Sequence, residues 1–141
     1  MRYALGFLIF APTALAAGGV FDGADVVFLG ELHDNPAHHL RQAELVVELQ
    51  PTALVFEMLT QAQADVVTAD LVADEAALEA ALGWNASGWP DFSMYYPIFA
   101  AAPEAAYFGA AVPREVARAA MAEGLHTGFR GDAELYGLTT P

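Results

Sequence analysis

The chain contains no cysteine and no lysine, and positive charge is scarce throughout. Its 141 residues include five basic residues, all arginine, against 18 acidic ones, for a formal net charge of −13. Without cysteine, a disulfide framework and a lipid-attachment cysteine are both excluded. The scarcity of basic residues argues against binding nucleic acid or an anionic membrane, since both need a basic surface. The length suits one small domain.

Residues 1–16 have the order of regions that is typical of a cleavable signal peptide. Met1 and Arg2 form a short positive region, residues 4–15 are apolar, and residues 14–16 form a small-x-small cleavage site. The apolar stretch is too short to cross a bilayer, which takes about 20 helical residues. We therefore expect a periplasmic or secreted protein whose residues 17–141 form the domain.

Apolar runs alternate with helical patterns along the rest of the chain. Residues 24–29, 53–57 and 106–111 are short apolar runs that predict buried strands. Helices are expected over residues 36–49, 60–71, 74–82, 91–102 and 113–123. This alternation predicts an α/β fold, with a partial parallel sheet of about three strands and flanking helices in βαβ units.

The helix expected over residues 36–49 has a well-defined start. Asn35 is a favourable N-cap, and Pro36 occupies the first helical position, where a missing N–H costs nothing. Its apolar spacing predicts an inward stripe of Leu40, Ala43 and Val47.

Two further local signals concern later helices. Thr60 with Gln63 three residues on forms a capping-box signature that starts a helix. Pro97 is expected to interrupt the helix over residues 91–102.

Residues 30–42 hold three of the four histidines and two carboxylates, next to the first predicted strand. Glu31 follows this strand, and Glu57 ends the second. Ligands in parallel sheets bind at the carboxyl ends of the strands. We therefore expect both carboxylates to face one crevice, with His33 and His38 beside them.

Two interpretations of this histidine-rich segment stay open. Glu31 and His33 could bind a divalent metal ion, with Glu57 as a further ligand or base, because carboxylate and imidazole suit such ions. Alternatively, Asp34 and Asn35 cap the following helix and the histidines of its first turn are solvated.

A second cluster, residues 89–99, is rich in aromatic side chains, including Trp89, Tyr95 and Tyr96. It could cover a flat apolar cofactor, with a phenolate on a ferric ion, or it could be the core stripe of a helix. Arg114 opens the last predicted helix and could hold a ligand carboxylate or pair with a surface group.

Taken together, these motifs resemble the ChaN-like haem-binding family of the Tiki and erythromycin-esterase-like superfamily. The matching residues are Gly-Glu-Leu-His-Asp at 30–34, His38, His39, Gln42, Phe-Glu-Met at 56–58, Gln61, Gln63, Trp89, Phe92, Tyr-Tyr-Pro at 95–97 and Pro-Arg at 113–114. They occur in the family's order along most of the chain after residue 16.

The resemblance implies an exported protein that binds haem for iron uptake rather than an enzyme. Tyr95 is the residue it suggests as iron ligand, with Tyr96 as the alternative. Further haem contacts would come from Glu31, His33, His38, Trp89 and Arg114. Its implied partners are haem, a second copy in a haem-bridged homodimer, and an outer-membrane haem uptake system.

The alternatives within the same superfamily are a divalent-metal-dependent hydrolase using Glu31, His33 and Glu57, or an inactive remnant. The chain departs from the family pattern in lacking the lipid-attachment cysteine and in having Ala111 and Val112 where an Asn usually precedes Pro-Arg. The resemblance covers the N-terminal half of the family's fold. We therefore expect a truncated sheet whose open edge favours dimerisation or a partner.

Overall fold

The computed structural model describes residues 21, 23–124, 131–132 and 134–135. The expected signal peptide, residues 1–16, lies outside these described residues. The elements in chain order are α1 (Pro36–Leu49), β1 (Ala53–Phe56), α2 (Gln61–Ala64), α3 (Ala69–Val72), α4 (Glu75–Leu82), the 3₁₀ turn η1 (Trp84–Ala86), α5 (Phe92–Ala100), β2 (Ala106–Gly109) and α6 (Arg114–Glu123). No described helix has the length and apolar character to cross a membrane.

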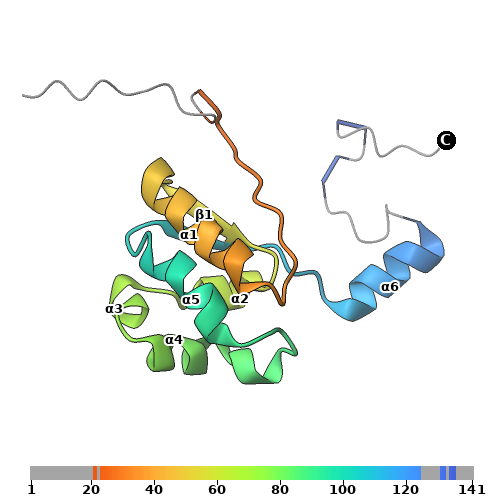
Figure 1. The fold of residues 1–141 in the computed structure, drawn as a ribbon. Coiled ribbons are helices and arrows are strands. Elements are labelled where there is room, and N and C mark those ends of the chain that lie inside the picture. The colour runs from red at the N-terminus through yellow and green to blue at the C-terminus, as the bar shows by residue number, and fades with distance from the viewer. Residues whose placement is uncertain (1–20, 22, 125–130, 133, 136–141) are drawn as a thin grey trace, which may run out of the picture.

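The described strands form a small parallel sheet, which confirms the α/β fold class. β1 pairs with β2 in the register Ala53 with Ala106 through Phe56 with Gly109. The chain between the strands forms α2 to α5, which supply the crossover that parallel strands require. α1 packs along α5, and Figure 1 shows α1 in front of β1.

The expectation of a third strand at residues 24–29 is wrong. This segment is extended but belongs to no sheet of the described chain. It keeps the alternation of a strand, since Val27 and Leu29 are half-buried whereas Val26 and Phe28 are exposed, Phe28 by 93%. The alternation therefore marks one half-buried side, but no residue of the segment is buried, and its backbone meets α1 at Leu29 instead of pairing with a neighbouring strand.

The start of α1 agrees with the sequence-based prediction. The Asn35 side chain accepts a hydrogen bond from the Ala37 N–H at 3.0 Å, and Pro36 is the first helical residue. At the other end Gln50 takes a left-handed conformation with φ 47° and donates its N–H to the Val46 carbonyl, so the helix ends there.

The inward face of α1 differs from the predicted stripe. Leu40 and Val47 are exposed, by 56% and 61%, whereas His39 and Gln42 are buried beside Ala43. The Gln42 amide donates to the Leu29 carbonyl at 3.2 Å, which ties the extended segment to the helix. Polar contacts to this segment, rather than the apolar stripe alone, decide which side of α1 faces inward.

The capping box of Thr60 and Gln63 is confirmed, with both reciprocal hydrogen bonds formed. The helix it starts ends at Ala64, and α3 is a separate helix with its own N-cap, Thr68. Pro97 does not interrupt α5, which continues to Ala100. A proline inside a helix removes one backbone hydrogen bond, and the core contacts of α5 tolerate that loss.

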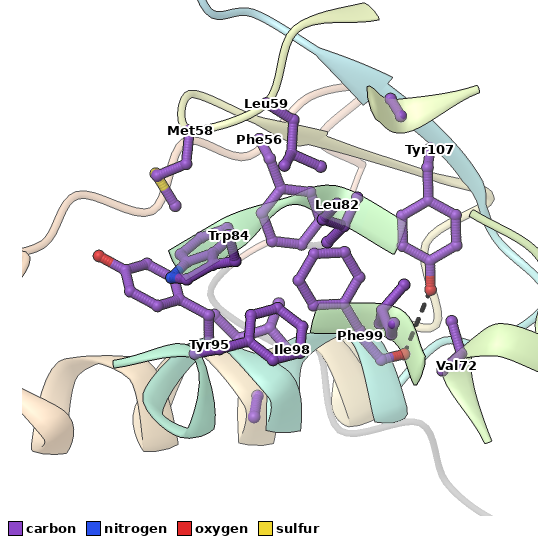
Figure 2. Close-up of a cluster of buried hydrophobic side chains, with 14 of the residues drawn as sticks. Phe56, Met58, Leu59, Val72, Leu82, Trp84, Tyr95, Ile98, Phe99 and Tyr107 are labelled. Carbon is purple, nitrogen blue, oxygen red and sulfur yellow. Dashed lines mark hydrogen bonds between the residues drawn. The ribbon is translucent and has the colours of Figure 1, made fainter. Parts of the chain in front are cut away.

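An aromatic cluster forms the core between the sheet and the helices (Figure 2). The rings of Phe56 and Phe99 stack with centroids 4.3 Å apart and an interplanar angle of 5°. The Tyr107 hydroxyl donates to the Phe99 and Ala102 carbonyls at 3.2 and 2.9 Å. Burial, with a smaller effect from the charge of Glu104, raises the pKa of Tyr107 to about 12.

Gly109, the last residue of β2, allows the loop after β1 to come close. A Cβ at this position would overlap the backbone of Thr60 and Leu59. The Ala111 N–H then donates to the Leu59 carbonyl at 2.8 Å. The loops that leave the two strands are thereby held together at the carboxyl edge of the sheet.

The aromatic core gives a direct stability prediction. Phe99 is fully buried in the cluster, so Phe99→Ala should lower the free energy of unfolding by about 3–5 kcal/mol through lost burial and a cavity. Phe28→Ala is the matched control, because the same side chain is almost fully exposed there. Urea denaturation measures both, and equal losses in the two variants would contradict this description of the core.

Candidate functional site

The candidate site is the loop between the extended segment and α1, at the carboxyl edge of the sheet. The Glu31 carboxylate lies between two imidazoles. Its Oε1 is 2.8 Å from Nδ1 of His33, and its Oε2 is 3.0 Å from Nδ1 of His39. The carboxylate side chain is 9% exposed, so these contacts lie largely out of water and are weakly screened.

The carbonyl oxygen of His33 accepts the hydrogen bonds that hold the backbone of this loop in place. Nε2 of His39 donates to it at 3.0 Å, and the Tyr95 hydroxyl donates at 3.3 Å. His39 belongs to α1 and Tyr95 to α5, 62 residues from His33 in the chain. One carbonyl therefore joins the loop to both packed helices.

These contacts define which ring nitrogen of His33 carries its proton. A carboxylate accepts hydrogen bonds, so Nδ1 of His33 donates to Glu31, and the neutral ring keeps its lone pair on Nε2. Nε2 has no hydrogen-bond partner among the described residues, and the side chain is 40% exposed. The site therefore presents a free imidazole nitrogen on a ring held in position by a carboxylate.

Two buried polar atoms beside this loop have no hydrogen-bond partner within the described part of the chain: Nδ1 of His39 and Oε1 of Gln42. Nδ1 of His39 is only 3.0 Å from Glu31, but the two groups are not aligned as a hydrogen bond requires. Buried polar atoms are normally satisfied, so spare hydrogen-bonding capacity of this kind is typical of a binding or catalytic site.

Trp89 provides an aromatic wall next to the free nitrogen. Its ring meets the His33 ring edge-on, with centroids 4.8 Å apart and an interplanar angle of 65°. Trp89 is half-buried against the core, and Leu32 is exposed on the same loop. Trp89 and Leu32 thus offer apolar groups near His33, whereas Asp34, the next residue along the loop, adds an exposed carboxylate.

Tyr95 lies on the inner side of this site and is fully buried. Its ring packs against His39 and Trp84, and Figure 2 shows it at one end of the aromatic cluster. Burial raises the pKa of Tyr95, and the negative charge of Glu31 raises it further. The charges of Glu57 and Asp34 add to this effect, so the phenol is held in its protonated form.

Three further candidate residues, His38, Tyr96 and Arg114, lie on different helices. Nδ1 of His38 accepts the Leu32 N–H at 2.9 Å, and the Tyr96 hydroxyl donates to the Val72 carbonyl at 3.0 Å. Arg114 is exposed at the start of α6, which Figure 1 shows apart from the other helices.

The carboxylates of Glu31 and Glu57 both act on Tyr95, as their expected positions at one edge of the sheet imply. Glu57 is nevertheless exposed, and the described residues contain no group of three His, Cys, Asp or Glu side chains that could hold a metal ion. The predicted set of Glu31, His33 and Glu57 is therefore not assembled as a metal site, and nothing specific favours the hydrolase alternative.

A shallow cavity of about 240 Å³ adjoins the loop and is lined by residues that include Gly30, His38, Arg41 and Gln42. A larger one, about 380 Å³, lies at the other end of the sheet, where Thr52 and Ala105 precede the strands. Because ligands of parallel sheets bind at the carboxyl edge, the larger cavity is not the candidate site.

His39 is the functional residue whose role the sequence-based interpretation missed. One of the two open interpretations made it a solvated first-turn histidine, and that interpretation is wrong for His39, which is fully buried and donates to the His33 carbonyl. A signal was present: His39, Ala43 and Val46 are spaced i, i+4 and i+7, which places them on one face of a helix.

Residues 20–140 match the protein family described as "Haem-binding uptake, Tiki superfamily, ChaN". The chain belongs to this family. The match covers Glu31, His33, Trp89 and Tyr95, so the ChaN family assignment includes the whole candidate site. It also confirms the resemblance that the motifs predicted. No curated protein and no solved structure matches the chain significantly.

The buried phenol of this ChaN family protein predicts a loss of stability in alkali. The folded state retains the Tyr95 proton at pH values where the unfolded chain releases it, because the pKa is raised from 10.0 on folding. This contribution is complete below pH 10 and is lost as the pH rises towards the folded-state pKa. Urea denaturation from about pH 8 to about pH 12 should therefore show a fall in the free energy of unfolding.

Tyr95→Phe should lower stability by about 1 kcal/mol at neutral pH and flatten the alkaline fall. Tyr107→Phe is the comparison variant, because the pKa of Tyr107 is also raised and the same flattening is expected. If Tyr95→Phe lost stability in alkali as steeply as the wild type, the buried phenol would not have the role described.

Proposed function

We propose that this chain binds haem at the surface formed by Leu32, His33 and Trp89, here called the His33 surface. The observation that carries the proposal is the free, carboxylate-held imidazole of His33 beside the Trp89 ring. Membership of a haem-binding uptake family supports haem as the ligand.

The chemistry of the His33 surface fits haem. Haem is a flat apolar ring whose iron takes nitrogen, oxygen or sulfur donors from the protein. Trp89 and Leu32 offer apolar contact for such a ring, and His33 offers a nitrogen donor. When bound, haem would supply the iron centre and the cargo, while the protein supplies the surface and the ligand.

Other residues remain proposed contacts of lower rank. Tyr95 would have to leave the His33 carbonyl and lose a proton to bind iron as a phenolate, and Tyr96 would have to leave Val72. His38 and Arg114 are proposed to contact haem propionates, since both carry polar groups at exposed or half-buried positions.

We further propose that the protein acts outside the cytoplasm in haem or iron acquisition. The signal-peptide pattern of residues 1–16 supports export, and the family's uptake role supports the purpose. A haem-bridged homodimer and an outer-membrane uptake system are the proposed partners.

Titration of the purified protein with haemin tests the proposal. A saturable shift of the Soret band is expected, and Trp89→Ala should weaken binding by about 10-fold, the equivalent of 1.4 kcal/mol of lost apolar contact. Leu40→Ala, an exposed apolar residue on the outer side of α1, should bind haemin like the wild type.

A Soret band identical to that of free haemin at all protein concentrations would overturn the proposed function. Binding that Trp89→Ala and Leu40→Ala weaken equally would show instead that haemin adheres to apolar surface without a specific site.

A further inference from the structure

We infer that α6 is a dimerisation element whose apolar side packs on the outer face of the sheet in a second copy of this chain. The α6 helix of the second copy packs on the first copy in the same way. This dimer needs no haem, so the inference does not rest on the proposed haem-binding function.

The outer face of the sheet is apolar and uncovered within the described part of the chain. Phe56 and Tyr107 are buried in the core on one side of the sheet, and the alternating residues face outward: Ala53, Val55, Ala106 and Phe108. Val55 is 66% exposed and Phe108 is 44% exposed, and the two are paired across the strands. Parallel sheets have both faces covered in folded proteins, so this outer face requires a partner.

α6 has an apolar side that matches the outer face in length. At about 100° per residue, one side of the helix carries Val116, Ala117, Ala120 and Met121, and the other side carries the charged residues. The helix has no buried residue, Met121 is 88% exposed, and Figure 1 shows α6 apart from the other helices. Ten helical residues measure about 15 Å and a four-residue strand about 13 Å, so one helix covers the sheet along its length.

The link between β2 and α6, residues 110–113, keeps the helix from folding back onto its own sheet. The Ala110 N–H donates to the Phe56 carbonyl at 2.9 Å. The Ala111 N–H donates to the Leu59 carbonyl at 2.8 Å, so half of the link is fixed at the sheet edge. Pro113 is extended, with φ −52° and ψ 137°, and a residue before proline is itself restricted to extended backbone. The chain therefore leaves the sheet without a turn, and α6 can reach the sheet of another molecule.

The charges of the two surfaces are compatible with a second copy as the partner. The outer face is uncharged, and the two arginines and two glutamates of α6 cancel, whereas the whole chain carries −13. Two acidic chains can therefore approach through these surfaces with the least repulsion. Arg114 and Arg118 border the apolar side of α6 beside Met121, and Glu57 is exposed where β1 ends, so the rims have opposite charge.

Each copy carries both halves of this interface. An exchange of α6 between two copies therefore closes as a symmetric dimer, in which neither the outer face nor the apolar side of α6 remains exposed.

The oligomeric state of the haem-free protein tests the inference. Analytical ultracentrifugation should give a mass of two chains. Val55→Asp and Ala120→Asp would each bury an unpaired carboxylate, so each should raise the dissociation constant of the dimer by about 100-fold. Ala122→Asp is the matched control, because Ala122 lies on the charged side of α6, and this variant should remain dimeric.

Because the chain has no cysteine, engineered disulfides can show directly which sheet α6 covers. Val55→Cys and Ala120→Cys proteins, mixed and oxidised, should form a disulfide between two chains that mass spectrometry of the linked peptides identifies. Replacing Ala120→Cys with Ala122→Cys should abolish this cross-link, since that side of α6 faces away from the sheet.

A monomeric wild type, or a dimer that neither Val55→Asp nor Ala120→Asp weakens, would overturn the inference. A Val55→Cys, Ala120→Cys double variant that links only within one chain would also overturn it, because α6 would then cover its own sheet. A dimer that forms only when haemin is added would contradict it as well. Should Val55→Asp lose its folded circular dichroism, the cross-link between Val55→Cys and Ala120→Cys proteins decides the outcome.

Discussion

The carbonyl oxygen of His33 is the point on which the candidate site depends. Residues 24–29 have no sheet partner in the described chain, so hydrogen bonds of a β-ladder do not hold the approach to α1. The hydrogen bonds from His39 and Tyr95 hold it instead, one from each of two packed helices. Gln42 adds a third contact, to the Leu29 carbonyl. These side chains replace the missing strand pairing and leave the outer side of the loop free to bind a ligand.

The same contacts show that the polar residues of the loop and the aromatic residues of the core have different roles in the site. A buried carboxylate is costly unless it is paired, and Glu31 meets two imidazoles, of which only His33 is aligned as a hydrogen bond. Burial, reinforced by the negative charges around it, raises the pKa of Tyr95 and keeps its phenol protonated, which preserves it as a donor to His33. The aromatic core therefore supports the site, while the imidazole of His33, whose side chain is 40% exposed, is the proposed ligand contact.

Much of the fold could be predicted from local signals, because caps and short apolar runs act through neighbouring residues. The N-cap Asn35, the capping box at Thr60 and both strands of the sheet were predicted in this way. The failures concern tertiary contacts. The apolar alternation of residues 24–29 indicated a more protected side, which is half-buried, but could not show whether a helix or a strand lies beside it. Periodicity places His39 on the same face as Ala43 and Val46, but it could not reveal that His39 donates to the carbonyl of His33.

The central claim is that Glu31 holds His33 with its proton on Nδ1 and its lone pair on Nε2. Two-bond ¹H–¹⁵N correlation spectra of the haem-free protein report this directly, because protonated and bare ring nitrogens differ widely in ¹⁵N chemical shift. A bare Nε2 is expected for His33 at neutral pH, with the signal assigned by its absence in His33→Gln. A proton on Nε2 with a bare Nδ1 would show that Glu31 does not hold the ring in this way.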